Sequence, residues 1–530
     1  MNKYKNVSVD TIGVDRLVRN PASYFSYYGF SRLYQFFSSP DYVRLEAKFT
    51  LQMSLDISRC FDSIYTHSIA WAVKSKELAK ESTQALSFEN QFDRVMQRLN
   101  HNETSGICIG PEASRIFAEV ILAKADQNAL SALSRYGIRD GLDFECRRYV
   151  DDYYVFANSE EVLSKFHIEI AKALREYNLH LNESKKAVIE RPFYNQKTFV
   201  RDKVNSCIKN LSMLILDQRS FNGVKLKIPR RIHNRRFLFL NFTREVKAAC
   251  YSSQLGYDAV ANYVISAMKG IVVDLVDSYP IARTMNDIQV SALDYRRVLS
   301  FLLDVGSYYF AFHPTVASSL RLSVAVVRTA QHLAKFDPEG MEIVRETIFR
   351  WSAQLLRSPM FSRLTQEGSA VPVELLNVLI CLREIGFDIT TVSELVEAAV
   401  KENPKANYFT TIVQLYIYRN HDGLSDRKDE IFQSARERLL SARDLTRDAE
   451  LTHLLLDLLA CPFIELPKRE MLIYDIWPIL RRAYNNIGKI TKRDARKIVR
   501  EIEKQNWFVR WEGIDLLNMI EKKELGTVYA

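Results

Sequence analysis

Two adjacent aspartates, Asp151 and Asp152, lie inside a segment that otherwise has the composition of a buried strand. The segment from Arg148 to Phe156 reads Arg-Tyr-Val-Asp-Asp-Tyr-Tyr-Val-Phe. Aromatic and β-branched residues favour strands, whereas burying an ionised carboxylate is costly. The conflict is resolved if the aspartates lie at the tip of a tight hairpin and face a metal ion. A third acid, Asp56, closes another strand-like run, and the three carboxylates together predict a metal-dependent phosphoryl-transfer site.

Converging carboxylates repel one another, and a divalent cation between them relieves that repulsion. Hard oxygen ligands suit Mg²⁺ or Mn²⁺. Two such ions about 4 Å apart would activate an attacking hydroxyl and stabilise the leaving pyrophosphate. We expect Asp56, Asp151 and the backbone carbonyl of Ile57 as ligands, with Asp152 as the third carboxylate. Paired acids are also common turn residues, so a plain hairpin turn is the alternative for Asp151 and Asp152.

The segments around these acids alternate between strand and helix patterns. Apolar and polar residues alternate from Phe49 to Asp56, which predicts a strand that ends at the aspartate. The spacing of apolar residues predicts helices over 63–80, 112–134 and 160–177, a hairpin of strands over 144–149 and 153–156, and a short strand over 186–190. This order matches a split βαβ, ferredoxin-like sheet in which the strands of Asp56 and Asp151 are central neighbours.

The pattern changes near residues 205–240, beyond which almost every segment has helical spacing. We therefore predict an α+β domain over 1–235 and an all-α domain over 236–530. No exact repeat period is visible, yet successive short helices are typical of a stacked helical array. The predicted helices cover 260–277, 298–312, 318–336, 340–356, 373–385, 392–402, 409–419, 428–442 and 447–459.

Four segments resemble the ordered motifs of reverse transcriptases. The run from Leu55 to Ile64 resembles motif A, the run from Gly110 to Leu122 motif B, Tyr149-Val150-Asp151-Asp152 motif C and the run from Leu181 to Lys185 motif D. They cover about a quarter of the chain, a share compatible with one catalytic domain. The resemblance implies a reverse-transcriptase-like fingers and palm region, with a ferredoxin-like palm.

The resemblance also implies roles for single residues. Asp56, Asp151 and Asp152 become the catalytic acids, and Lys185 takes the place of a lysine that protonates departing pyrophosphate. Phe61 takes the place of the residue under the sugar, where a ring favours deoxynucleotides, and Gly110 allows close backbone approach to the nucleotide. The alternatives are a core aromatic for Phe61, a solvated lysine for Lys185 and a helix-start turn for Gly110.

Two features of this chain differ from most reverse transcriptases and narrow the resemblance to one group among them. Only a short segment precedes Asp56, and Arg16, Arg32, Arg44 and Lys48 are candidates there for gripping a triphosphate. The Pro-Gln-Gly of motif B is replaced by Cys108-Ile109-Gly110 followed by Pro111-Glu112. This form of motif B and a long helical C-terminal half (HEAT-like repeats) are similar to the bacterial abortive-infection reverse transcriptases. That family implies anti-phage defence, a protein hydroxyl as primer, synthesis of single-stranded DNA from dNTPs without a template, and a homo-oligomer. The chain has 26 tyrosines, so the primer stays open among Tyr4, Tyr24, Tyr27 and Tyr28.

The formal net charge of +9 suits a polyanionic partner. One dense basic run predicts nucleic-acid contact through Lys225, Arg230, Arg231, Arg235 and Arg236, and a second run extends from Arg481 to Arg500. A solvated surface is the alternative for both. Seven scattered cysteines without Cys-x-x-Cys spacing fit a reducing cytoplasm, and no apolar stretch reaches membrane-spanning length.

Two other functions remain open at this stage. A conventional RNA-templated reverse transcriptase of a retroelement would copy an added template. A catalytically silent nucleic-acid-binding scaffold would incorporate no nucleotide, although it would have no reason to keep repelling, buried carboxylates.

Overall fold

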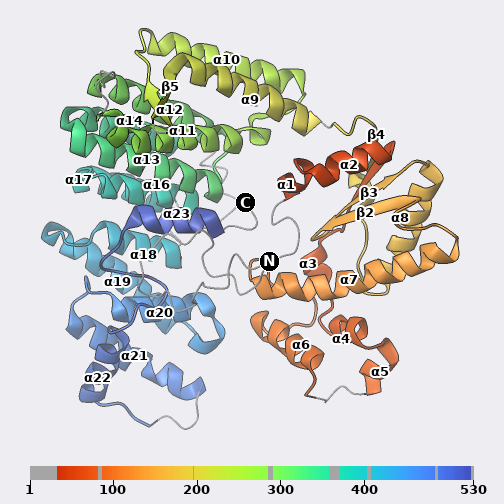
Figure 1. Ribbon diagram of the computed structural model, residues 1–530. Coiled ribbons are helices and arrows are strands. Elements are labelled where there is room, and N and C mark those ends of the chain that lie inside the picture. The colour runs from red at the N-terminus through yellow and green to blue at the C-terminus, as the bar shows by residue number, and fades with distance from the viewer. Residues whose placement is uncertain are drawn as a thin grey trace. The chain divides into compact units, whose positions relative to one another are not determined.

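The structure is a computed structural model, and it describes residues 33–81, 86–194, 196–221, 223–284, 291–356, 358, 371–402, 407–483 and 488–526. Tyr4, Arg16, Tyr24, Tyr27, Tyr28 and Arg32 lie outside the described residues. The described chain forms two compact units that divide between Asn195 and Gln196 (Figure 1).

The first unit contains a four-stranded antiparallel sheet of order β2-β3-β1-β4. Its strands are β1 (Leu51–Asp56), β2 (Phe144–Tyr149), β3 (Asp152–Ala157) and β4 (Ala187–Glu190). Strand β3 lies between β1 and β2, so the split βαβ order expected from the sequence is present. In the β1–β3 register, Leu51 is opposite Ala157 and Asp56 is opposite Asp152.

Helices cover both faces of this sheet. On one face, α7 (Glu112–Arg135) and α8 (Glu160–Arg175) share a core with alternate strand residues such as Leu55, Tyr153 and Val155. On the other face, α1 (Leu33–Phe37) and α2 (Pro40–Lys48) form a smaller, aromatic-rich cluster with Phe156. Because side chains alternate along a strand, β3 contributes to both cores.

The single helix expected over 63–80 is instead interrupted. The structure has α3 (Cys60–Ser63), α4 (Ser68–Val73) and α5 (Lys76–Glu81), followed by α6 (Phe88–Leu99). Tyr65 forms an isolated bridge with Ser105, and the Thr66 N–H donates to the Thr104 carbonyl at 2.9 Å. The backbone at 65–66 is therefore engaged by a distant segment, and periodicity within a helix pattern could not reveal that.

The second unit opens with α9 (Gln196–Ile215) and the hairpin of β5 (Leu216–Phe221) and β6 (Val224–Pro229). These elements lie before the boundary predicted at 235, yet Val200, Val204 and Ile215 belong to the core of the helices that follow. The compact units therefore divide earlier than the sequence suggested, because α9 buries its apolar face in the helical unit.

The rest of the second unit is helical, as the sequence predicts. One core extends from α9 to α17 and also includes the end of α18 and part of α23, and another core extends from α18 to α22. Contacts link α11 to α13, α13 to α16, α16 to α18, α18 to α20 and α20 to α22, as in a stack. None of the described helices is long and apolar enough to cross a membrane. Their bounds are α10 (Arg235–Ser252), α11 (Ala261–Ala282), α12 (Ala292–Phe312), α13 (Val316–Phe336), α14 (Pro338–Leu356), α16 (Val373–Glu384), α17 (Ile389–Glu402), α18 (Tyr408–Ile417), α19 (Ser425–Leu440), α20 (Ala449–Ala460), α21 (Leu466–Ala483), α22 (Lys492–Ile502) and α23 (Leu516–Gly526).

Candidate active site

The end of β1 and the tip of the β2–β3 hairpin meet at one edge of the sheet. The Ile57 N–H donates to the Asp151 carbonyl at 3.2 Å, and Asp56 is paired with Asp152 in register. Residues directly opposite in an antiparallel pair project to the same face. Backbone pairing therefore brings Asp56 together with Asp151 and Asp152, which are adjacent to each other but distant from Asp56 in the sequence.

Asp56 and Asp151 line a pocket of about 440 Å³ in this unit. Asp152 is not among the described lining residues, although it lies opposite Asp56. The expected residues Ile57, Phe61 and Lys185 line the pocket, and so does Asn182, which the sequence did not single out. The complete lining is Asp56, Ile57, Ser58, Arg59, Cys60, Phe61, Asp62, Ile109, Asp151, Asn182 and Lys185.

A 3₁₀ turn (Glu183–Lys185) brings Lys185, one of the two cations among the lining residues, to Asp56. The Asn182 N–H donates to the Asp56 carbonyl at 2.8 Å and fixes the start of this turn. The Lys185 ammonium lies 3.1 Å from Asp56 Oδ2 while most of its side chain stays exposed. The hydrogen bond to Asp56 raises the pKa of Lys185, so the lysine is a cation at neutral pH.

The electrostatics of Asp151 would favour a nearby cation. Burial raises the pKa of Asp151; the Asp56 carboxylate adds to this effect, and the Lys185 ammonium opposes it. Within the described residues, no three His, Cys, Asp or Glu side chains gather as a complete metal cluster. Mg²⁺ is usually held by one or two carboxylates together with substrate phosphates. Asp56, Asp151 and the Ile57 carbonyl therefore offer the small set of oxygen ligands that such an ion takes from a protein.

The hairpin tip is strained and is held by a buried arginine. Val150 has φ of 56°, which is unusual for a β-branched residue and marks stored strain. Arg148 Nη1 donates to the Val150 carbonyl at 3.0 Å. The same guanidinium contacts Glu119 at 2.8 and 2.9 Å and Asp126 at 2.8 Å, both on α7. Arg148 thus connects α7 to the turn that presents Asp151.

The turn after β1 places Phe61 in the pocket. The Ile107 N–H donates to the Phe61 carbonyl at 2.9 Å, so the strand-like segment before α7 holds this turn and continues to Ile109 at the pocket. Gly110 has φ of +118°, which side chains rarely adopt, and a Cβ there would meet nothing. The backbone bend before α7 therefore explains this glycine, and its contact with a nucleotide remains a prediction.

Cys60 lies in the same turn, directly before Phe61. Its side chain is buried, and that burial raises the pKa of the thiol to about 12, with the nearby Asp151 charge adding to the effect. The thiol therefore stays protonated beside the two carboxylates.

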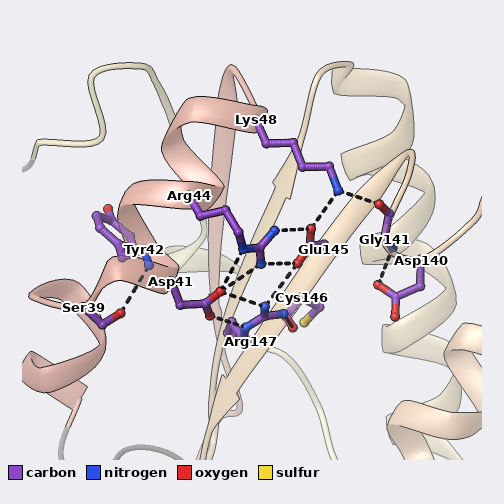
Figure 2. Close-up of polar contacts among 10 residues, drawn as sticks. All are labelled: Ser39, Asp41, Tyr42, Arg44, Lys48, Asp140, Gly141, Glu145, Cys146 and Arg147. Carbon is purple, nitrogen blue, oxygen red and sulfur yellow. Dashed lines mark hydrogen bonds and ion pairs between the residues drawn. The ribbon is translucent and has the colours of Figure 1, made fainter.

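Arg44 and Lys48, two candidates for gripping a triphosphate, are engaged with the sheet (Figure 2). Arg44 contacts both oxygens of Glu145 at 2.9 and 2.7 Å, and Lys48 lies 2.8 Å from the same carboxylate. Hydrogen bonding by Arg44 lowers the pKa of Glu145 to about 2. The two cations fasten α2 to β2, so both of these candidates are already paired with a carboxylate.

The basic run predicted to contact nucleic acid belongs to the second unit. Arg235 pairs with Asp304, and Arg230 lies 3.8 Å from Asp217. Lys225, Arg231 and Arg236 are exposed. Their contact with nucleic acid stays a prediction.

Comparisons with known proteins agree with the motifs. Residues 9–222 match the family described as reverse transcriptase (RNA-dependent DNA polymerase). No match was found among curated proteins. Among solved structures, telomerase from Candida albicans in complex with a fragment of telomeric RNA has a TM-score of 0.22 at 10% identity, covering 62% of this chain and 52% of that chain. Apo telomerase from Candida tropicalis has a TM-score of 0.23 at 10% identity, covering 59% and 52%. The chain thus spans about half the length of these structures, and at such TM-scores the likeness adds nothing to the fold described above.

Proposed function

We propose that this chain is a DNA polymerase of anti-phage abortive-infection defence. Its residues 9–222 match the reverse transcriptase family, and with this domain the chain is a nucleotidyltransferase of the RNA-directed DNA polymerase type. We propose further that it starts synthesis on a hydroxyl of the protein, extends single-stranded DNA without a template and acts as a homo-oligomer. The observation that carries the polymerase assignment is the convergence of Asp56 and Asp151 in one pocket beside Lys185.

In this proposal each pocket residue has one task. Asp56, Asp151 and the Ile57 carbonyl hold Mg²⁺ or Mn²⁺, and Asp152 supports them from the neighbouring position on β3. The bound ions supply Lewis-acid activation of the attacking hydroxyl and charge neutralisation at the phosphates. Lys185, a cation held on Asp56, is placed to give a proton to departing pyrophosphate.

Phe61 and the hairpin set the geometry of the substrate. The ring of Phe61 lines the pocket, and a deoxyribose fits beside a bulky ring where a 2′-hydroxyl would collide. Arg148 keeps the strained Val150 turn in place, so the Asp151 carboxylate meets the substrate already oriented.

The start of α7 supports synthesis without a template. Glu112 opens this helix and lies 3.3 Å from Arg115, while Ser114 is fully buried. The glutamine that helps place nucleotide and template in other members of the family is replaced here. The cytoplasm is the proposed compartment, because the scattered cysteines are all free.

Labelled dNTPs and Mg²⁺, added to the purified full-length protein without primer or template, test the proposal. We expect label that stays on the protein band in a denaturing gel, and loss of that label to background in Asp151→Asn. Asp140→Asn is the matched control, because Asp140 is an exposed loop acid of the same unit.

Two other outcomes contradict the proposal. Label that requires an added primer and template would assign the conventional RNA-templated enzyme. No label in any of these reactions would assign a nucleic-acid-binding scaffold.

A further inference from the structure

A second pocket, of about 970 Å³, lies entirely within the helical unit. Its walls come from α10, α12 and α14, and its lining combines aromatic rings with arginines. The lining includes Arg236, Phe239, Tyr308, Phe312, Arg350 and Trp351.

The aromatic rings form a continuous wall. Phe239 and Tyr308 have ring centroids 5.4 Å apart at 81°, and Tyr308 and Phe312 have centroids 4.9 Å apart at 75°. Edge-to-face packing of this kind holds rings rigidly. Phe312 is still 41% exposed, so ring surface remains open to a planar ligand.

One carboxylate organises the polar side of the pocket. Asp304 accepts a hydrogen bond from Trp351 Nε1 at 3.1 Å and pairs with Arg235, which also donates to Ser300. Arg350 lies 4.0 Å from Asp304 and is mostly exposed. Asp304 therefore orients the Trp351 indole and one guanidinium.

The lining carries more positive than negative charge. Arg235, Arg236 and Arg350 face a single carboxylate, Asp304. Arg236 is exposed and has no ion-pair partner within the described part of the chain. Arg236, and Arg350 with its long ion pair to the already paired Asp304, are thus available to an anion, next to rings that can receive an apolar plane.

From this combination we propose that the pocket binds an unpaired nucleobase together with its phosphate, as a segment of single-stranded DNA. Every base has a face that stacks on an aromatic ring, and a basic groove follows the backbone. Guanidinium groups pair with phosphate oxygens in a bidentate manner. The inference deepens the proposed function, because it gives the DNA product a binding place in the helical unit.

The test measures DNA binding without synthesis. Anisotropy of a fluorescein-labelled oligothymidylate is followed with the full-length protein, without dNTPs or divalent metal. We expect the double variant Arg236→Gln, Arg350→Gln to raise Kd at least about tenfold. We also expect the slope of log K against log salt to fall by about 1.4, since each phosphate contact to a single strand contributes about 0.7.

Arg443→Gln is the matched control, because Arg443 is an exposed arginine of the same unit that does not line the pocket. The same Kd and salt slope in the double variant and in this control would overturn the proposal. Thermal unfolding of each variant checks that its fold is intact.

A crosslinking experiment on the wild-type protein gives an independent answer. An oligonucleotide that carries 5-bromodeoxyuridine is irradiated on the protein, and the adducts are located by peptide mass spectrometry. We expect adducts on Tyr308 or Trp351, whereas adducts confined to residues 33–194 would overturn the proposal.

Competition separates a strand from a free nucleotide. If dTMP displaces the labelled strand at the same concentration as unlabelled oligothymidylate, the pocket takes mononucleotides and the assignment to a strand is wrong. The Asp151→Asn variant is expected to make no DNA, so its binding of the labelled strand is measured separately from synthesis. This distinguishes failure of the pocket in the helical unit from failure of the polymerase assignment.

Discussion

At the scale of the residue, Asp56 and Asp151 are held close together by backbone pairing. Asp151 is half-buried and its pKa is raised, while the Lys185 ammonium lies on the neighbouring Asp56. A raised pKa means that the fold disfavours the ionised form of this aspartate. The associated stability is present at low pH and is lost as the pH rises through the pKa of Asp151.

Asp151→Asn is therefore expected to stabilise the metal-free protein at neutral pH while it abolishes activity. The melting temperature of the catalytic unit should rise by a few degrees, since about 1 kcal/mol corresponds to roughly 2–4 °C for domains of 150–250 residues. Mg²⁺ with dNTP should raise the melting temperature of the wild type more than that of the variant. A lower melting temperature for Asp151→Asn would contradict this account.

Lys185→Met is expected to move the acid limb of the pH–rate profile to higher pH. The ammonium lowers the pKa of Asp151, so without it the carboxylate is protonated, and inactive, at a higher pH. Lys186→Met is the control, because Lys186 is an exposed neighbour outside the pocket. An acid limb that stays in place, or that moves equally in the control, would show that Lys185 does not act on Asp151.

Phe61→Ala is expected to relax the discrimination against ribonucleotides. A steric conflict of about 1–3 kcal/mol corresponds to roughly 5–150-fold in the ratio of dNTP to rNTP incorporation. The ratio is measured from kcat/KM for each nucleotide. Phe88→Ala, at an exposed aromatic outside the pocket, should leave it unchanged. If the ratio of dNTP to rNTP incorporation is unchanged in Phe61→Ala, the ring of Phe61 serves only the packing of the core.

At the scale of the element, α7 acts as the support of the catalytic hairpin. Glu119 and Asp126 lie on one side of this helix and both contact Arg148, and Tyr153 donates to Asp126 at 2.7 Å. Through these contacts, Arg148 connects acidic residues of α7 to the strained turn at Val150. It explains how a hairpin with an unfavourable Val150 conformation persists.

Arg148→Lys is expected to lower activity by about 10–100-fold, the usual cost of losing an outer-shell partner. A lysine is a point charge and cannot reach Glu119, Asp126 and the Val150 carbonyl together. Because the hairpin would lose its orientation, the Mg²⁺ concentration for half-maximal rate should also rise. Arg147→Lys is the control on the same strand, and equal effects in both variants would indicate a general loss of stability.

The sequence predicted the elements whose signal is local. Alternation ended β1 at Asp56, the hairpin was visible from its two apolar runs, and the helix after Gly110-Pro111 begins where expected. The break near Tyr65 was missed because it depends on pairing with Ser105. Arg148 was missed because its partners are far away in the chain, although two acids seven residues apart on one helix were an available signal.

At the scale of the whole molecule, the described chain has two units with separate hydrophobic cores. Each unit buries its own apolar side chains, so a single free energy of unfolding does not describe the protein. The pocket of Asp56 and Asp151 lies in one unit and the aromatic and arginine-lined pocket in the other. Binding of nucleotide and binding of DNA can therefore be measured as stabilisation of different parts of the chain.

Calorimetry should show two unfolding transitions that core substitutions shift separately. Leu122→Ala in the sheet unit and Leu379→Ala in the helical unit each remove a fully buried side chain. Each should cost about 2–5 kcal/mol and lower only the transition of its own unit. A single transition lowered by both substitutions would mean that the units unfold together.

The burial of Cys60 has a practical consequence for the chemistry of the catalytic centre. At pH 7 a thiol with a pKa of about 12 is ionised in only about one molecule in 10⁵. Alkylating reagents and peroxides attack the ionised sulfur. We therefore expect the Cys60 thiol, which lines the same pocket as Asp56 and Asp151, to resist peroxide and iodoacetamide, and peptide mass spectrometry of the treated protein checks this.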